Sequence, residues 1–307
     1  MFHNKIICCY LYPITKYGYP PPAEQTIHHL QEMKALGFQT VELEGIREQH
    51  LLSIYDRRLE IKKQLEELNL NVPYFCVVLP GLSSADPKVS SKNLELFNKG
   101  CEIAELFGSL GILDNGPIPP YQFPGEVPVV RHYDEDVWRM AQFPKNLNWK
   151  KYWEHLIGTY QTACEIAAQW SLTFHLHPCL GSMTANCDGF LYFHDAVARN
   201  NLRFNFDTAN QFALKDNLAL ALRRLADHVD YIHLSDNRGT KIEHLPPGMG
   251  NIRWDIVFET LDLIGFQGHI GLDIGGEESG VREIDQVYME AGGWLERNWG
   301  GRLSSDQ

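Results

Sequence analysis

The chain has no excess of positive charge and no long apolar segment. It contains 27 lysines and arginines against 39 aspartates and glutamates, which gives its 307 residues a formal net charge of −12. A surface of that sign repels phosphate backbones and anionic bilayers, so we expect neither a nucleic-acid partner nor a membrane partner. No segment approaches the roughly 18 consecutive apolar residues of a transmembrane helix, which predicts a soluble protein.

Two other signatures are missing. The seven cysteines are scattered and odd in number, and none forms a C-x-x-C pair. They predict reduced thiols in a cytoplasmic protein rather than a disulfide framework. A G-x-G-x-x-G segment after the first expected strand is also absent, which argues against an open, doubly wound nucleotide-binding sheet.

The sequence does contain a regular alternation of short apolar segments with longer segments of helical periodicity. We expect strands at 5–12, 38–44, 72–79, 109–114, 171–177, 202–207, 229–235 and 268–274. We expect helices at about 22–36, 48–69, 87–107, 148–170, 187–200, 211–227, 251–264 and 281–298. Gly37, Gly108 and Gly265 lie where a helix should end. Eight β-then-α units without a break in composition predict a single-domain (β/α)8 TIM barrel over residues 1–307.

One connection is much longer than the others. Residues 115–147 follow the fourth expected strand and are rich in proline and aromatic residues, which argues against disorder. A connection at the C-terminal end of a barrel strand lies over the barrel mouth. We therefore expect a substrate-covering lid, whose Tyr121, Phe123, Tyr133 and Trp138 offer flat apolar surface for stacking on a substrate.

Polar side chains are predicted to converge inside the barrel. Active sites of such barrels use the C-terminal ends of the strands, and alternation of period two shows which side chains point inward. The inward acids and imidazoles are Glu42, Glu44, His175, His177, Asp207, His233 and Asp273. So many buried acids and imidazoles need compensation, which a divalent cation supplies. Mixed nitrogen and oxygen ligation suits Mn, Fe, Co or Zn better than Ca.

The same residues also have a structural interpretation. A lone histidine or aspartate at a strand end is often only a satisfied polar residue. Glu42, deep in the barrel, could belong to a core ion pair, and His177 before a proline could merely cap its strand. We expect His194, His228 and His244 at the surface.

The C-terminal third resembles the xylose isomerase-like barrel superfamily of sugar isomerases and epimerases. The resemblance rests on "YIHLSDNRG" at 231–239 and "HLPPGMGNIRWDIVFETLDLIGFQGHIGLDI" at 244–274. Members carry H-x-x-D at the seventh strand, then P-G-x-G-x-(I/V)-x-W, a helix, and G-(Y/F)-x-G before the eighth strand. The matching residues are His233, Asp236, Pro247, Gly248, Gly250, Ile252, Trp254, Gly265, Phe266 and Gly268. The rhythm of eight units extends the resemblance over the whole chain.

The resemblance implies one divalent metal, held by a residue from each of strands five to eight. The implied ligands are His175, Asp207, His233 and Asp273. The family has glutamates at the first and last of these positions, and those glutamates also serve there as an acid and base pair. Symmetric epimerisation is therefore less secure here, and two negative charges in place of three make a bound metal a stronger Lewis acid.

Further roles complete the predicted site. His177 and Glu44 are candidate bases, and Arg238, Trp138 and Asn210 are candidate substrate-binding residues. If Asp273 is too short, Glu277 or Glu278 could reach the metal instead. Asp236 is expected to orient the loop of His233.

The predicted function is chemistry next to the carbonyl of a sugar or polyol, with isomerisation or epimerisation as the outcome. A dehydratase or lyase acting on a keto-sugar, inosose or 3-keto-glycoside is the alternative. A barrel that only binds a ligand stays open, as does an assembly of identical subunits. The superfamily also contains DNA-repair endonucleases with several metals and a basic groove, against which the net charge of −12 speaks.

Overall fold

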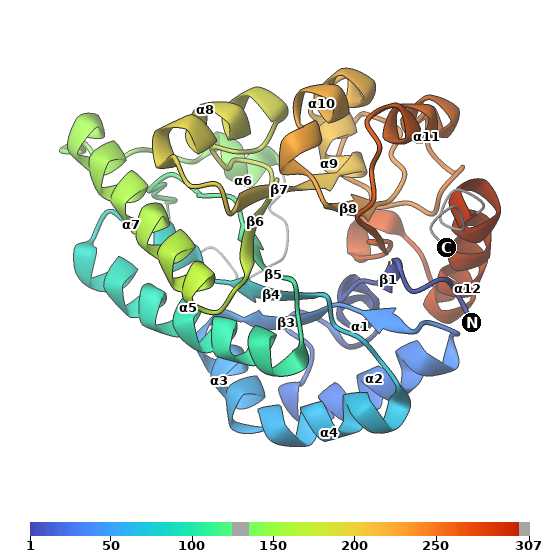
Figure 1. The fold of residues 1–307 in the computed structure, drawn as a ribbon. Coiled ribbons are helices and arrows are strands. Elements are labelled where there is room, and N and C mark those ends of the chain that lie inside the picture. The colour runs from blue at the N-terminus through green and yellow to red at the C-terminus, as the bar shows by residue number, and fades with distance from the viewer. Residues whose placement is uncertain (125–134, 301–307) are drawn as a thin grey trace.

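The strands of the protein form a barrel. The structure is a computed structural model that describes residues 1–124 and 135–300. The strands are β1 (Ile6–Cys8), β2 (Thr40–Val41), β3 (Leu43–Ile46), β4 (Tyr74–Val78), β5 (Gly111–Asn115), β6 (Thr173–His177), β7 (Leu202–Asp207), β8 (Tyr231–Leu234) and β9 (His269–Leu272). They follow the order β2-β1-β9-β8-β7-β6-β5-β4-β3, and every pairing is parallel (Figure 1).

The two ends of this order belong to one position of the barrel. β2 pairs with β1 and β3 pairs with β4, while only Glu42 separates β2 from β3 in the chain. The segment 40–46 therefore joins both edges of the sheet. This arrangement confirms the predicted (β/α)8 barrel.

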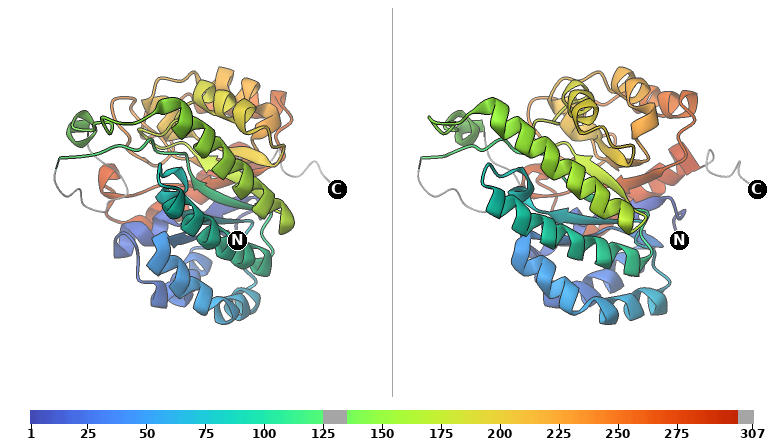
Figure 2. Two further views of the ribbon diagram at one scale, coloured as in Figure 1. Left: turned by 90° about the vertical axis from the view of Figure 1, so that its left-hand side faces the viewer. Right: turned by 60° about the vertical axis from the view of Figure 1, so that its left-hand side comes forward.

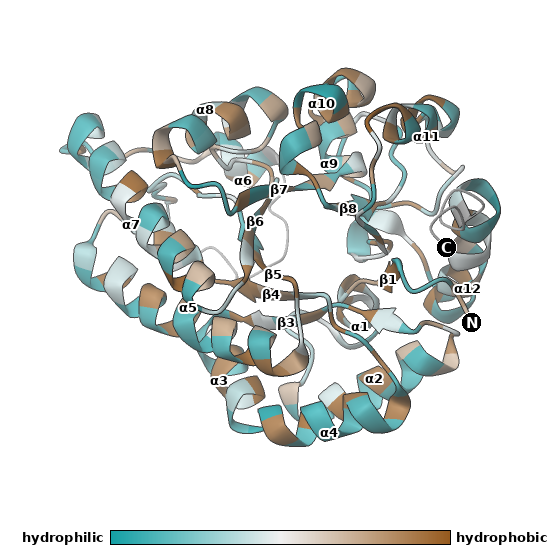
Figure 3. Cartoon of the chain, in the orientation of Figure 1, coloured by the Kyte–Doolittle hydropathy of each residue, from teal (hydrophilic) through white to brown (hydrophobic). Residues whose placement is uncertain are grey.

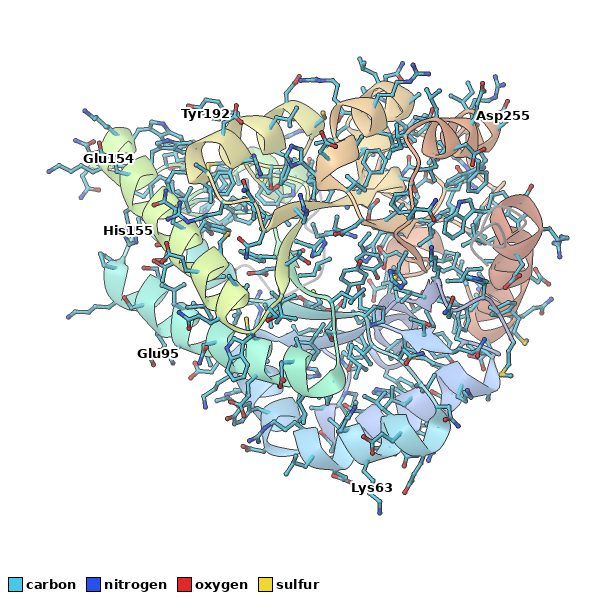
Figure 4. The ribbon with its side chains drawn as sticks, in the orientation of Figure 1. Lys63, Glu95, Glu154, His155, Tyr192 and Asp255 are labelled. Carbon is cyan, nitrogen blue, oxygen red and sulfur yellow. The ribbon has the colours of Figure 1, made fainter. Side chains whose placement is uncertain are left out.

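Helices surround the barrel (Figures 1 and 2). They are α1 (Leu11–Tyr17), α2 (Thr26–Ala35), α3 (Arg47–Asp56), α4 (Arg58–Leu68), α5 (Pro87–Phe107), α6 (Glu135–Arg139), α7 (Trp149–Gln169), α8 (Cys187–Val197), α9 (Thr208–Ala213), α10 (Leu218–Arg224), α11 (Trp254–Leu263) and α12 (Ile284–Leu295). Hydrophilic residues alternate with hydrophobic ones around outer helices such as α4 (Figure 3). The side chains of Lys63 on α4 and Glu154 on α7 point away from the barrel (Figure 4).

Local signals explain where several elements begin and end. The carboxylate of Asp86 accepts a hydrogen bond from the backbone N–H of Lys88 at 2.9 Å, and α5 starts between them. The helix ends at Gly108, whose φ of 78° is a left-handed conformation that glycine adopts without strain. The predicted helix 87–107 is confirmed for that reason.

Tertiary packing changed two other predictions. The first expected strand stops at Cys8, and Leu11–Tyr17 form helix α1 instead of continuing it. This apolar segment is buried as a helix, where the Tyr12 ring packs edge-on against Tyr288 of α12 at 5.2 Å. The expected helix 48–69 is divided into α3 and α4 at Arg57.

The long connection lies at one end of the barrel. Residues 125–134, and with them Tyr133, lie outside the described residues. Gln122 and Gln142 form an antiparallel bridge that joins the two arms of the segment. Figure 2 shows α6 at the end of the barrel opposite the N-terminus. Because this segment follows β5, it lies at the C-terminal ends of the strands, as predicted.

Two further expectations were reduced cysteines and the absence of a transmembrane helix. All seven cysteines are unpaired thiols. Among the described residues, no helix combines the length and apolar character needed to cross a membrane.

Candidate metal centre

Three imidazoles and two carboxylates converge at the C-terminal end of the barrel. They are His177 of β6, Asp207 of β7, His233 of β8, His244 of the loop after β8, and Asp273 just after β9, and all are buried. Asp207 Oδ2 lies 3.7 Å from His177 Nε2 and 3.8 Å from His244 Nε2. Asp273 Oδ2 lies 3.5 Å from His244 Nε2 and 3.9 Å from His233 Nδ1. We call these five residues the cluster.

In each imidazole of the cluster, one ring nitrogen lies within hydrogen-bond distance of a side-chain oxygen outside the cluster. The three contacts are His177 Nδ1 to Asn205 Oδ1 at 2.8 Å, His233 Nε2 to Glu42 Oε2 at 3.0 Å, and His244 Nδ1 to Glu278 Oε1 at 2.9 Å. A ring nitrogen that donates to such an oxygen leaves the other ring nitrogen as an electron-pair donor. That second nitrogen faces Asp207 or Asp273 in every case, and this is how histidine ligands of metals are oriented.

Two features of the cluster fit a bound cation: buried polar atoms without a hydrogen bond, and the spacing of the donor atoms. Asp207 Oδ2 and His233 Nδ1 are buried and make no hydrogen bond within the described chain. Buried polar atoms are rarely left in this state. Donors placed tetrahedrally at metal-ligand distances lie about 3.4 Å apart, and the nitrogen–oxygen distances in the cluster are 3.5–3.9 Å. Three nitrogens and two carboxylate oxygens suit Mn, Fe, Co or Zn.

The charges of the cluster depend on one another. Burial by itself raises the pKa of Asp207, but the nearby imidazoles of His244, His177 and His233 hold it below its usual value. Burial lowers the pKa of His177. For His233, burial is outweighed by Glu42, Asp273 and Asp207, which raise its pKa to about 9. A cation that binds His233 Nδ1 near neutral pH therefore displaces a proton from the ring. The cluster therefore keeps Asp207 as a carboxylate, the form that binds a cation.

His175 does not lie with the other predicted ligands. Its ring is fully buried near the opposite end of the barrel, where Nε2 lies 2.5 Å from Asp230 Oδ1 and the ring packs edge-on against Tyr74. Asp230 precedes β8, whereas Asp207 ends β7. Both His175 and His177 point inward, but two residues advance a strand by about 6–7 Å. The residue of β6 that reaches the cluster is therefore His177, which we had expected to be a base.

Three other predicted residues occupy different surroundings from those expected. Glu44 lies beside Cys76 and Tyr10 and belongs to none of the metal-capable groups of the described chain. Arg238 is exposed and pairs with Glu243 at 2.7 Å, outside the cavity described below. Asn210 is fully buried, and its Nδ2 donates to Pro178 O at 2.7 Å and lies 3.2 Å from His177 Nε2. Asn210 therefore contacts a cluster residue instead of an open surface.

The expected core ion pair of Glu42 is present. Its carboxylate accepts from His233 and also from the Tyr231 hydroxyl at 2.7 Å. Of the two alternative acids after β9, Glu278 contacts the cluster through His244, while Asp273 itself reaches it.

His244 is the cluster residue that sequence reasoning missed. It was expected at the surface, yet it is fully buried, with a left-handed φ of 45°. It lies in a loop, so strand alternation could not reveal it. The available signal was its position directly before the Leu-Pro-Pro-Gly segment of the recognised motif.

Asp236 explains how this loop is held. Its backbone pairs with Leu245 through hydrogen bonds of 2.7 and 2.9 Å. Its carboxylate accepts from Gly248 N at 2.7 Å, Ile252 N at 3.2 Å and the Trp254 indole N–H at 3.0 Å. A side chain at Gly250 would meet Asp236 Oδ1 at 2.2 Å, so only glycine fits there. The H-x-x-D and P-G-x-G-x-I-x-W residues thus form one scaffold that brings His244 inward.

A large cavity lies among the loops at the C-terminal end of the barrel, and its described lining does not include the five cluster residues themselves. Its volume is about 1630 Å3, and it is lined by the segments after β3, β4, β5, β6 and β9 and by residues 240–242. Trp138 of the long connection lines it, as predicted, together with Tyr121 and Phe123. Glu278 also lines it and connects it to the cluster through His244.

Comparison with known proteins gives concordant matches. The xylose isomerase-like TIM barrel family matches residues 30–298. The L-ribulose-5-phosphate 3-epimerase UlaE of Escherichia coli O1:K1 / APEC is 23% identical over 257 residues, covering 81% of each protein. The structure of 3-keto-D-glucoside 4-epimerase YcjR from E. coli superposes with a TM-score of 0.70 at 18% identity, over 96% of this chain and 100% of that one. The structure of the probable 3-DHS dehydratase AsbF from Bacillus anthracis superposes with a TM-score of 0.67 at 13% identity, over 94% of this chain and 98% of that one.

Proposed function

The chain belongs to the xylose isomerase-like TIM barrel family, and from its site we propose that it is a divalent-metal-dependent isomerase or epimerase of a keto-sugar or related polyol. The observation that carries this proposal is the arrangement of the three imidazoles. Each has one nitrogen bonded to an oxygen and the other turned toward Asp207 or Asp273. The sugar epimerases among its relatives support the substrate class.

We assign the metal to the cluster, with His177, Asp207, His233, His244 and Asp273 as its donors. A divalent cation bound there supplies Lewis acidity, which makes the C–H bond beside a sugar carbonyl more acidic. Asn205, Glu42 and Glu278 fix the ring orientations of the three histidines.

The proton transfer needs a group that reaches both the substrate and the cluster. Glu278 lines the cavity, contacts His244 at 2.9 Å and has a side chain that is 18% exposed. We assign it the role of proton acceptor. Glu44 and His177, the bases expected from the sequence, lack this position, because Glu44 is outside the cavity lining and His177 faces Asp207.

A metal-dependent dehydratase or lyase on a keto-sugar, inosose or 3-keto-glycoside is the second candidate. Two features favour it. The glutamates that the family carries at two metal-binding positions are replaced in this chain, and two other glutamates, Glu42 and Glu278, lie beside the cluster. Glu278 lines the cavity, whereas Glu42 is only 1% exposed and is bonded to Tyr231 and His233. A proton can thus leave toward one side, and the described cavity lining offers no second glutamate bonded to the cluster that would return it from the other side.

Proton exchange in deuterated water tests the proposal. The purified protein is analysed for metal and then incubated in D2O with ketoses, inososes and 3-keto-glycosides, before and after removal of metal by a chelator. An isomerase or epimerase incorporates deuterium beside the carbonyl only with metal. A lyase forms an unsaturated product and releases water from a ketose or an inosose, or the aglycone alcohol from a 3-keto-glycoside. A metal-free protein with no exchange on any of these compounds would refute both candidates.

A further inference from the structure

The cavity is larger than a single keto-sugar requires. Its volume of about 1630 Å3 exceeds the roughly 300–1,000 Å3 of pockets that enclose a drug-sized molecule. A monosaccharide is smaller than such a molecule and would fill only the part next to the cluster. The remaining space has room for a second part of the same substrate.

The two parts of the cavity differ in chemistry. On one side, Glu278 joins it to the cluster through His244, and Glu277 lies beside it. The long connection contributes Ile118, Pro119 and Pro120 to the lining, together with the rings of Tyr121, Phe123 and Trp138. We call these three rings the aromatic wall.

The three rings of the aromatic wall pack against one another and against the loop after β6. The Trp138 ring lies 5.6 Å from that of Tyr121 and 5.9 Å from that of Phe123, and the Tyr121 hydroxyl donates to Gly181 O at 3.4 Å. A side chain at Gly181 would approach the Trp138 indole to 2.6 Å, so the six-membered ring of the indole packs against this glycine of the loop after β6. Because the same loop follows His177, the wall is anchored near the cluster.

The charges of the described lining do not favour an anionic group on the substrate. The acidic Asp86, Glu277 and Glu278 outnumber the cationic Arg47 and Lys241. Asp114 also lines the cavity, but burial raises the pKa of its carboxyl to about 8. A phosphate would therefore gain little from the lining, whereas a planar apolar group gains burial and stacking from the aromatic wall.

We propose that the substrate is an uncharged keto-glycoside with an aromatic aglycone, which binds against the aromatic wall while its sugar lies toward the cluster. The sugar end of this inference rests on the proposed function. The aglycone end rests on the volume of the cavity and on the wall, and it does not depend on metal chemistry.

Binding of two unreactive probes tests the aglycone site. Phenyl and methyl β-D-glucopyranoside differ only in the aglycone, and their affinities for the full metal-loaded protein can be measured by calorimetry. We expect the phenyl glucoside to bind at least about 10-fold more tightly, in line with the burial of one aromatic ring. Trp138→Ala should bring the ratio close to one, and Trp138→Leu, which keeps an apolar side chain without the ring, should lower it as well.

Trp149→Ala is the matched control. Trp149 lies on α7, is 49% exposed, stacks on Trp153 and does not line the cavity. This variant should keep the ratio of the natural chain. Equal affinities for the two probes, no binding of either, or a ratio that survives both Trp138 variants would overturn the inference.

The two proposals can fail separately. Metal-dependent deuterium exchange on small keto-sugars, together with equal affinity for the two probes, would leave the proposed function standing and remove the aglycone site. A clear preference for the phenyl glucoside in a protein that exchanges no proton on any keto-sugar would leave the aglycone site standing and refute the proposed function.

Discussion

The sharpest test of the cluster compares two buried histidines that lie at different heights in the barrel. His244→Ala removes one of the five proposed donors and leaves Glu278 without its contact at 2.9 Å. Loss of a partner that only orients a ligand costs about 10- to 100-fold in metal affinity, so loss of a ligand should cost at least about 100-fold. His175→Gln instead changes a ring bonded to Asp230 at 2.5 Å, far from the cluster.

The expected magnitude follows from ligand linkage. At a metal concentration 100 times the dissociation constant of the natural chain, binding stabilises the folded state by about 2.7 kcal/mol. For a chain of 307 residues, that corresponds to a rise in the unfolding temperature of about 4 °C. At the same metal concentration, a 100-fold weaker site gains only about 0.4 kcal/mol, or less than about 1 °C.

Thermal unfolding with and without metal, together with elemental analysis, measures the difference. His175→Gln should lower the free energy of unfolding by about 1–3 kcal/mol, because it alters a buried hydrogen bond, yet it should keep the full metal-dependent rise in unfolding temperature. His244→Ala should lose that rise and its bound metal. If His244→Ala keeps both while His175→Gln loses them, the assignment of the cluster is wrong.

Three further variants probe the site and its support. Glu278→Gln keeps an oxygen acceptor for His244 and should retain metal, but proton exchange should slow by about 100-fold or more; unchanged turnover would restrict Glu278 to orienting His244. Asp236→Ala leaves buried N–H groups of the loop 245–254 without an acceptor, each costing about 1–3 kcal/mol, so the unfolding free energy and the metal content should fall together; full metal content would contradict the scaffold role. Burial raises the pKa of Asp114 to about 8 from 3.8, so the stability that this carboxyl contributes is complete below about pH 4 and is lost as the pH rises to about 8. Asp114→Asn should flatten that decline in urea unfolding between pH 5 and pH 8, and parallel profiles for both proteins would refute the assignment.

The sequence by itself determined the barrel and the direction of its inward side chains. Alternation of period two is a local property of a strand, so it placed Asp207, His233 and Asp273 inside before any tertiary contact was known. Helix α5 was bounded to the residue, because Asp86, Pro87 and Gly108 carry their start and stop signals in the chain itself.

Only the tertiary structure decided which inward residues share a site. His175 and His177 satisfy the same alternation, and the height of each strand in the barrel is set by pairing with its neighbours, so the local sequence cannot say which of them meets Asp207. His244 lies in a loop whose path depends on contacts among Asp236, Gly250 and Trp254 in the folded structure. A loop has no repeating geometry to read from its sequence, and the contact of His244 with two aspartates from different strands is therefore a product of the fold.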